Sequence, residues 1–463
     1  MSARGGDAVV CVDFGSTFTK AALVERGTGR LLARAEHPTT IATDVLDGWR
    51  ACRTELAGVD PRAADAEVRA CSSAGGGLRI AVVGNEELVT AEAGRRVALS
   101  SGGKVVAVLS GAATGGLRSV DALAEARPDV VLLVGGTDDG EEDSIRTSAA
   151  TLASARWPTP VVVAGNSAVR DEVCATLAAA GVPHVPADNV VPRIGVLAPD
   201  SARAAIRAMF VSHVIGGKEL SADPAFAAMV HGATPDVVLA GVELLASLVG
   251  DVVVVDVGGA TTDVHSCVEP DPEARAVVAE ARAQRTVEGD LGMRWSALTT
   301  VAEDPEADAG LRAAAARRHD DPSFVPDGVD AAQEAAYDER LATLAVRTAL
   351  RRHAGRTQVV YDARGRVVLS TGRDLREVEL VVGSGGALRH AGPDASARVL
   401  GAATAPDGWQ LPERPRVLVD TAYVLAAAGL LADNEPDAAR ELLRMHLLAT
   451  GTLAPWPTGR ASD

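Results

Sequence analysis

Short apolar runs at the start of the chain predict a meander of three strands. Residues 9–14 form an apolar run that ends in a Gly-Ser turn, and residues 20–25 and 31–36 give two further short strand-like runs. Runs of this length, separated by turn residues, are typical of β-strands with tight connections. We expect this meander to begin a first lobe.

From residue 43 to residue 199 the pattern changes to an alternation of apolar strands and helical stretches. Residues 144–155, which follow an acidic turn, have a helical composition. The strands expected in this segment are residues 80–83, 105–109, 130–134 and 161–164. Such alternation favours parallel strands joined by helices. The segment is too long for a loop, so we interpret it as an α/β domain inserted into the first lobe.

The second half of the chain repeats the opening pattern. After helical stretches at residues 202–210 and 236–248, residues 252–257 form an apolar β-branched run of the buried-strand type. The chain then turns at a Gly-Gly pair and returns along residues 262–268, and residues 276–285 give a third strand. This second meander predicts a second lobe of related design.

The remaining segments complete the second lobe. Residues 303–352 are rich in Ala, Arg and Glu and predict a helical insertion, and residues 378–382 form another buried strand. Two helical stretches follow at residues 422–431 and 437–448. The expected boundaries are 1–42 and 200–250 for the first lobe, 43–199 for the inserted α/β domain, 251–302 and 376–450 for the second lobe, 303–375 for the mainly helical insertion and 451–463 for a flexible tail.

Composition and charge narrow the class of protein. The chain has 62 acidic and 45 basic residues, a formal charge of −17, which repels nucleic acid and anionic membranes. Its five cysteines include no CxxC pair, which argues against a zinc site, and their odd number argues against a secreted disulfide framework. The N-terminus lacks the apolar core of a signal peptide, and the apolar stretch 237–255 is interrupted by Glu243 and Asp251. We expect a cytoplasmic protein with neither nucleic-acid nor membrane partners.

The first candidate site lies in the sequence VVCVDFGSTFTKAALV. A strand delivers Asp13 to its C-terminal end, where Gly15, Ser16 and Thr17 can turn backbone N–H groups towards a ligand. Concave rows of N–H groups hold phosphate. Because Asp13 is acidic, it needs Mg²⁺ between itself and a phosphate, whereas Lys20 can place its charge directly on a phosphate oxygen. The alternative interpretation is an ordinary hairpin with a turn aspartate.

The second candidate site, VVVVDVGGATTDV, repeats this design. Asp256 follows four valines, and Asp263 adds a second carboxylate on the returning strand. The residues expected at the phosphate are Gly258, Gly259, Thr261 and Thr262. Two strand–Asp–Gly hairpins about 240 residues apart indicate a phosphate chain held from both sides. We therefore predict Asp13, Asp256 and Lys20 as catalytic residues, and Asp13, Asp256 and Asp263 as the magnesium ligands.

The third candidate site, VELVVGSGGALRH, has three glycines between a buried strand and a helix. Glycine lets the backbone approach a flat base or a ribose without a Cβ clash. By itself the segment could be a helix N-cap turn. In third position, after two phosphate hairpins, Gly383, Gly385 and Gly386 predict an adenosine site.

These three motifs, in this order, resemble the nucleotide-binding signatures of the actin, sugar-kinase and DnaK superfamily, whose fold has two duplicated ribonuclease-H-like lobes. Within it the chain resembles the glutamate mutase accessory protein family (MutL/GlmL, unrelated to the mismatch-repair protein). The likeness covers most of the chain and rests on the collinear motifs DFGSTFTK, HPTT, CSSAGGGLRIAVVG, LLVGGTDDG, VVVAGN and RTVEGDLGMR. One departure is Asp139, where glycine is expected, and it argues against anion binding at that turn.

The resemblance implies an actin-like ATPase fold, ATP and Mg²⁺ as cofactors, and subunits of an adenosylcobalamin-dependent mutase, such as glutamate (methylaspartate) mutase, as partners. Radical mutases lose the adenosyl group of their cofactor in side reactions and keep the damaged cobalamin bound. A slow ATPase that acts as a molecular chaperone could use hinge closure on nucleotide to release it. The resemblance thus implies a reactivating accessory ATPase.

Two other functions fit the same scaffold. A small-molecule kinase needs a general base near the γ-phosphate and the acceptor hydroxyl. No segment of the sequence clearly supplies one, and Asp44 and Asp138 stay open as alternatives. A non-catalytic actin-like assembly protein needs a self-complementary interface, which the sequence does not display. Glu288 and Asp290 could reach ribose or Mg²⁺. Thr234 stands where related proteins carry the Gln or Glu that orients the attacking water, which predicts slow hydrolysis.

Overall fold

The computed structural model describes residues 5–41, 43–74, 78–85, 90–111, 116–215, 220–270, 281–325, 328–362, 365–401 and 408–449. The predicted tail and the first half of the predicted strand at 276–285 lie outside these residues. The chain divides into two compact units. Unit 1 comprises Met1–Gly241, Pro270–Gln284 and Gly429–Ala438, and unit 2 comprises Val242–Glu269, Arg285–Ala428 and Ala439–Asp463.

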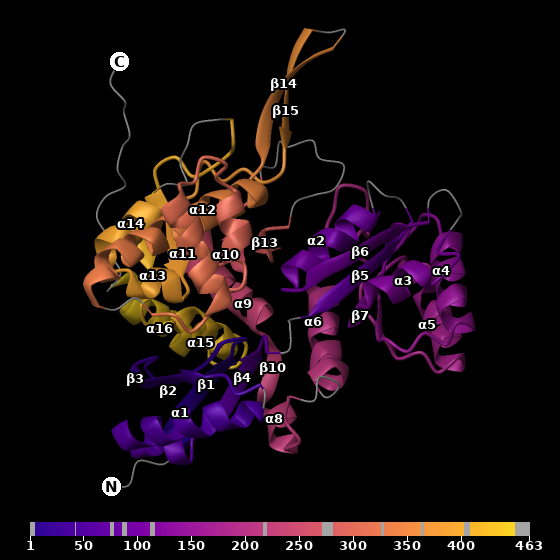
Figure 1. Ribbon diagram of the computed structural model, residues 1–463. Helices are drawn as coiled ribbons and strands as arrows, with labels where there is room; N and C mark the ends of the chain where they lie inside the picture. Colours follow the sequence, from indigo (N-terminus) through magenta and orange to yellow (C-terminus); the bar gives the residue numbers. More distant parts are fainter. Residues whose placement is uncertain are drawn as a thin grey trace. The chain divides into compact units, whose positions relative to one another are not determined.

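The first sheet of unit 1 contains the expected meander and two added parallel strands (Figure 1). Its strands are β1 (Ala8–Phe14), β2 (Phe18–Glu25), β3 (Leu31–Pro38), β4 (Glu67–Ser72) and β10 (Val230–Ala233), in the order β10-β4-β1-β2-β3. β1 is central, and all seven of its residues are buried. Helix α1 (Val45–Val59) packs on β2 and β3 and is capped by Asp44, which accepts a hydrogen bond from the Leu46 amide.

A second, entirely parallel sheet forms the inserted domain. Its strands are β5 (Arg79–Gly84), β6 (Lys104–Ser110), β7 (Val130–Leu133), β8 (Val161–Val163) and β9 (His184–Pro186), in the order β6-β5-β7-β8-β9. The helices that accompany it are α2 (Glu92–Ser100), α3 (Asp121–Ala126), α4 (Asp143–Ser154), α5 (Arg170–Ala179) and α6 (Asp200–Met209). The four expected strands are present, and β9 is a short additional strand that the sequence pattern did not predict.

The structure differs from the expected start of the insertion at residue 43. α1 and β4 belong to the first sheet, because β4 pairs in parallel with β1 and α1 covers β2 and β3. The insertion therefore begins after β4. One hydrophobic cluster includes side chains of the first sheet and of one face of the inserted sheet, whereas the opposite face has a core of its own. The inserted domain thus shares part of its core with the first lobe.

Unit 2 contains a sheet with the same topology as the first. Its strands are β11 (Val252–Val257), β12 (Thr262–Cys267), β13 (Ala283–Glu288), β16 (Leu380–Ser384) and β17 (Arg416–Val419), in the order β13-β12-β11-β16-β17. In both sheets the central strand has an antiparallel neighbour and then one further strand on one side, and two parallel strands on the other. This repeat confirms the α/β class and the two duplicated lobes.

The helices α10 (Ala297–Ala302), α11 (Ala309–Asp320) and α12 (Ala331–His353) account for the predicted helical insertion, and α12 packs on β11 and β12. The end of that segment differs from the prediction. The two strands β14 (Arg356–Asp362) and β15 (Gly365–Thr371) pair in antiparallel fashion as a ribbon, in keeping with their content of β-branched residues (Figure 1). The later helices are α13 (Gly386–His390), α14 (Pro393–Gly401), α15 (Val424–Leu431) and α16 (Pro436–Leu443). None of the helices that the structure describes has the length and apolar character needed to cross a membrane.

Candidate functional site

Asp13 lies near the end of β1 and is buried within unit 1. Only 4% of its surface is exposed, and its Oδ1 accepts a hydrogen bond from Thr234 Oγ1 at 2.5 Å. The Cys71 thiol, at the partner position on β4, lies 3.5 Å from the same oxygen. Burial raises the pKa of Cys71 well above its usual range, so the thiol stays protonated and donates to the carboxylate. Thr234 is the first residue of α9 (Thr234–Val249). Its hydroxyl is already used in the hydrogen bond to Asp13.

The first turn connects β1 to β2 and is open to solvent. The Gly15 amide donates to Phe18 O at 3.1 Å, and a Cβ at Gly15 would lie 2.6 Å from that oxygen, so the turn requires glycine. Ser16 and Thr17 are exposed at its tip. Lys20 is the partner of Asp13 across the β1–β2 pair. The structure thus brings all five predicted residues of the first motif together.

Asp256 occupies the corresponding place in unit 2, at the end of β11. It is half-buried and accepts a hydrogen bond from Ser384 Oγ at 3.2 Å. Ser384 is the partner of Asp256 on β16, just as Cys71 is the partner of Asp13 on β4. Gly385 follows with a φ of +86°, and a Cβ there would lie 2.7 Å from Asp256 Oδ1. Only glycine lets the third motif approach this carboxylate so closely.

The second turn, residues 258–261 between β11 and β12, has three consecutive carbonyl groups that accept hydrogen bonds from a single segment, residues 293–296. The hydrogen bonds run from Met293 N to Gly258 O (3.0 Å), from Arg294 N to Gly259 O (2.7 Å) and from Ser296 Oγ to Ala260 O (2.6 Å). In a trans peptide the N–H points away from the C=O of the same unit, so three successive amides face the opposite side. These are the amides of Gly259, Ala260 and Thr261, for which the described part of the chain provides no hydrogen-bond acceptor. Such a row of amides is suited to an anion.

The two polar residues of β12 nearest the turn are already engaged. Thr262 is fully buried, and its hydroxyl donates to Leu291 O at 3.1 Å. Asp263 accepts hydrogen bonds from Thr261 Oγ1 at 3.1 Å and from the buried Arg285 guanidinium at 2.6 Å. Asp263 therefore orients Thr261 through its hydroxyl.

The predicted magnesium ligands do not form a metal cage. Among the residues that the structure describes, no group of three or more His, Cys, Asp or Glu side chains could hold a metal ion. Mg²⁺ in nucleotide sites takes one or two carboxylates and completes its shell with phosphate oxygens and water. The carboxylate of Asp13 in unit 1 and that of Asp256 in unit 2 each offer one ligand of this kind, whereas Asp263 is paired with Arg285.

The third motif combines one packing glycine with an accessible one. A Cβ at Gly383 would lie 2.8 Å from Leu388 Cδ1, so this glycine permits core packing. A Cβ at Gly386 would meet only His390, at 4.0 Å, so space remains beside the start of α13. Sequence reasoning missed two residues of the same unit, Arg389 and Tyr423. The Arg389 guanidinium lies 5.3 Å from the centroid of the Tyr423 ring, and Tyr423 has a φ of +56°. Nothing in the sequence indicates the positive φ of Tyr423. Arg389 could have been noted, because it follows the Gly385-Gly386 pair by three residues.

The other predicted candidates have structural partners. Asp44 caps α1, and Asp138 accepts hydrogen bonds from Asn189 Nδ2 at 2.9 Å and from the Ser167 amide at 3.1 Å. Although burial raises the pKa of Asp138, these hydrogen bonds lower it below its usual value. Both carboxylates therefore have structural partners in unit 1.

Glu288 and Asp290 both bind Arg352 of α12, each at 2.8 Å. Burial raises the pKa of Glu288, and the hydrogen bond from Arg352 lowers that of Asp290. These two carboxylates therefore join the end of β13 to α12.

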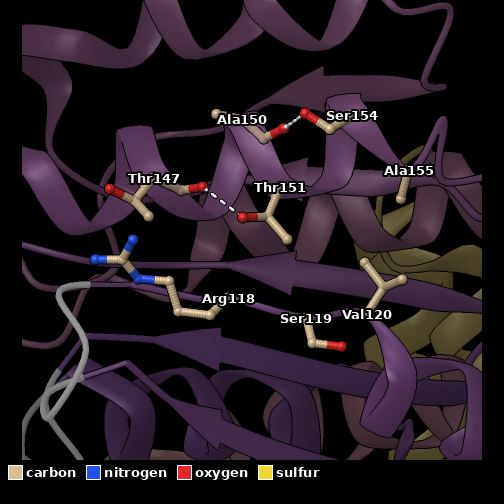
Figure 2. Close-up of a pocket in the computed structure, with 8 residues that line it drawn as sticks. All are labelled: Arg118, Ser119, Val120, Thr147, Ala150, Thr151, Ser154 and Ala155. Atoms are coloured by element: carbon tan, nitrogen blue, oxygen red, sulfur yellow. Dashed lines mark hydrogen bonds between the residues drawn. The ribbon is translucent and has the colours of Figure 1, made fainter.

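A hollow of about 570 Å³ lies on the inserted domain (Figure 2). It is lined by residues of α4 and of the segment that precedes α3: Arg118, Ser119, Val120, Thr147, Ala150, Thr151, Ser154 and Ala155. The hydroxyls of Thr151 and Ser154 donate to carbonyl groups of their own helix, at 3.0 Å and 2.7 Å. The hollow contains none of the predicted site residues and no catalytic group.

Comparison with known proteins identifies relatives of the whole chain. A family model described as MutL protein matches residues 9–447. Protein MutL of Clostridium tetanomorphum is 33% identical over 467 residues, which cover 96% of this chain and 99% of the relative.

Solved structures give weaker likenesses. Nucleotide-free acetone carboxylase is 15% identical with a TM-score of 0.40 and covers 92% of this chain and 70% of its own. The activator of the 2-hydroxyisocaproyl-CoA dehydratase from Clostridium difficile with bound ADPNP is 11% identical with a TM-score of 0.29, and covers 93% and 95%. Because these TM-scores are below 0.5, the duplicated fold rests on the sheet topology of this chain.

Proposed function

The chain belongs to the MutL protein family, and from this premise we propose that it is an ATP-binding accessory protein that reactivates an adenosylcobalamin-dependent mutase. The observation that carries the nucleotide part is the pair of duplicated strand-end carboxylates, Asp13 and Asp256, each beside a glycine turn. A single hairpin of this kind is common. The occurrence of one in each of the two related sheets supports a function that uses both hairpins.

The phosphate-binding part of the proposal uses the two turns differently. In unit 1, Lys20 supplies a positive charge next to Asp13, and the tip residues Ser16 and Thr17 are exposed. In unit 2, the amides of residues 259–261 supply N–H donors whose orientation is set from behind. Mg²⁺, when bound, would neutralise phosphate charge, and Asp13 and Asp256 would hold it directly or through water.

The adenosine end of the nucleotide is assigned to the third motif. Gly385 brings the chain close to Asp256, and the space beside Gly386 admits a ribose or a base. Arg389 and Tyr423 offer a stacked pair of flat groups in the same unit, and flat cationic and aromatic groups bind the face of a purine.

Hydrolysis is expected to be slow. The hydroxyl of Thr234 is bonded to Asp13, so it does not replace the Gln or Glu that would orient the attacking water. Catalysis then rests on positioning and charge, and we expect basal turnover on the order of one per minute or less. A measured basal rate above about 10 s⁻¹ would contradict this. Slow turnover suits a protein that changes the state of a partner.

The client part of the proposal rests on family membership and on the inserted domain. That domain is larger than a nucleotide site requires, and its described residues contain no catalytic cluster of their own. We assign it to contact with mutase subunits. A cycle of nucleotide binding and hydrolysis would then release cobalamin that has lost its adenosyl group, so that fresh cofactor can bind.

The experiment that tests the proposal is a rescue assay with the mutase encoded nearest to this gene. The mutase is inactivated by its own turnover and then supplied with fresh adenosylcobalamin, purified protein and Mg²⁺–ATP. We expect recovery of mutase activity with ATP, and no repeated rounds with a non-hydrolysable analogue. The matched control is Asp13→Asn, which should bind the mutase without rescuing it. Failure of ATP-dependent rescue and complex formation, together with stoichiometric phosphorylation of a metabolite, would favour a small-molecule kinase instead.

A further inference from the structure

The segment behind the second turn also contacts the helical insertion, and one arginine makes both contacts. The Arg294 amide donates to Gly259 O at 2.7 Å. The side chain of the same residue reaches Asp338 of α12, with 3.4 Å between Nη1 and Oδ1. Arg294 also donates to its neighbours Met293 O at 2.9 Å and Phe324 O at 3.5 Å. Its backbone is therefore attached to the turn and its guanidinium to the insertion.

The other end of this connection is anchored in a buried ion cluster. Asp338 also accepts a hydrogen bond from Arg318 Nε of α11 at 2.8 Å. Arg318 is completely buried and donates further to Glu334 Oε2 at 2.8 Å and to Ala314 O at 3.0 Å. Breaking one member of a buried charge cluster is costly, because the remaining charges lose their partners in a low-dielectric environment. Asp338 is thus a shared acceptor whose position depends on both arginines.

The contact with the turn leaves little freedom for independent movement. A Cβ at Gly259 would lie 3.5 Å from Arg294 Cβ and Cγ, and a Cβ at Gly292 would lie 2.7 Å from the carbonyl carbon of Ala260. A shift of the 258–261 turn by a bound phosphate must therefore displace the 292–296 segment as well. Displacing Arg294 changes its distance to Asp338, and through Asp338 it affects the Arg318 cluster.

We propose that Arg294 is a positioning residue that couples occupancy of the second turn to the packing of α11 against α12. This inference rests on the proposed nucleotide function and adds a route by which unit 2 responds to the nucleotide. In this coupling the nucleotide stabilises α11 through the Arg294–Asp338 contact. Because coupling is reciprocal, a change that loosens this contact weakens nucleotide binding.

The test compares the full-length protein with Asp338→Asn. Binding of a non-hydrolysable ATP analogue is measured by calorimetry, and amide hydrogen exchange of α11 is measured with and without the analogue. For the parent protein we expect slower exchange in α11 when the analogue is bound. For Asp338→Asn we expect binding to weaken by about 5-fold or more and the change in α11 exchange to disappear.

The matched control is Glu339→Gln, one residue along the same helix. Glu339 forms a two-pronged pair with Arg398, at 2.6 Å and 2.7 Å, and has no contact with Arg294. We expect this variant to bind nucleotide within about 2-fold of the parent, as surface ion pairs contribute little. If Asp338→Asn does not fold, Arg294→Lys carries the test, since lysine keeps the charge and the backbone bond but loses the planar fork.

Two outcomes separate this inference from the function on which it rests. Asp338→Asn that binds the analogue and still shows the parental change in α11 exchange would overturn the coupling and leave nucleotide binding intact. A parent protein that does not bind the analogue would overturn the proposed function itself, and the coupling with it.

Discussion

The two hairpin turns share a backbone and differ in charge. In each, a glycine amide closes a four-residue turn, Gly15 to Phe18 at 3.1 Å and Gly258 to Thr261 at 2.9 Å. Each central strand ends in an aspartate. Across the hairpin, however, Asp13 faces Lys20, whereas Asp256 faces Asp263. The two hairpins thus share the strand-end carboxylate and the turn, and the residues opposite the two aspartates have opposite charges.

The supports of the two turns differ as well. In unit 1 a single carbonyl of the turn is held from outside the hairpin, by the Thr39 amide on Thr17 O at 2.8 Å, among the residues that the structure describes. In unit 2 three consecutive carbonyls are held by the 293–296 segment. Asp13 is nearly buried and Asp256 is half-buried. Under the proposed function, the first turn would supply a positive charge to the phosphate chain and the second turn would supply oriented amides.

The most severe test removes the feature that the two turns share. Asp13→Asn and Asp256→Asn should each reduce ATP hydrolysis by about 100-fold or more, because the carboxylate that would hold Mg²⁺ is lost. Both variants should remain folded, since Asn has the same shape and can still accept the hydrogen bonds from Thr234 or Ser384. Single-turnover hydrolysis and circular dichroism are the measurements. Parental hydrolysis rates in both variants would refute the assignment.

The next test addresses the residues that differ in charge. Lys20→Met should weaken ATP binding by about 10-fold or more, because a charge-assisted contact to phosphate contributes about 1.5–3 kcal/mol. Asp263→Asn should instead lower the stability of unit 2, since it leaves the buried Arg285 without its charge partner. Calorimetry and urea unfolding separate the two effects. If Asp263→Asn lost as much affinity for ATP as Lys20→Met and lost no stability, the two turns would not differ in the way described.

A smaller effect is expected when the support of the second turn is strained. Gly292→Ala places a methyl group 2.7 Å from the Ala260 carbonyl carbon and should weaken nucleotide binding by about 10-fold, as overpacking of this kind costs about 1–3 kcal/mol. Gly27→Ala is the control, because nothing lies within 4 Å of a Cβ at that position in the β2–β3 connection. Affinity for an ATP analogue is the readout. An unchanged affinity in Gly292→Ala would show that the turn does not depend on its support.

The smallest expected effect is a difference between the two units in how stability depends on pH. The buried histidines among the described residues, His265 and His353, both lie in unit 2. Burial lowers the pKa of His353 from 6.5 to about 3, and it lowers that of His265 well below its usual value. His353 stays neutral between the hydroxyls of Ser266 and Thr286, at 2.7 Å and 2.9 Å.

The sign of the effect follows from the direction of that shift. In the unfolded chain His353 takes up a proton below pH 6.5, whereas in the folded chain it does so only near pH 3. Its contribution to stability is therefore complete above pH 6.5 and falls as the pH drops from 6.5 towards 3. Hydrogen exchange should show β12 losing protection earlier than β1 between pH 7 and pH 5. His353→Gln should reduce that difference, and earlier loss in β1 would contradict the expectation.

The sequence by itself determined the local features of this protein. Runs of valine followed by Asp and Gly specify a buried strand and a tight turn through neighbouring residues alone, so both hairpins and the expected strands of the inserted sheet were predictable. The order of the motifs likewise predicted the duplication, which the two sheets confirm. The candidate residues Asp13, Lys20 and Asp256 lie where these local rules place them.

Only the tertiary structure decided which distant residues support those features. The pairing of β4 with β1 moved the start of the insertion, because a parallel contact is made by residues far apart in the sequence. The partner of Asp263 is Arg285, and the support of the second turn comes from Arg294 and its neighbours, about 35 residues further along the chain. A local pattern carries no information about such contacts, because they form only when separate segments are packed against one another.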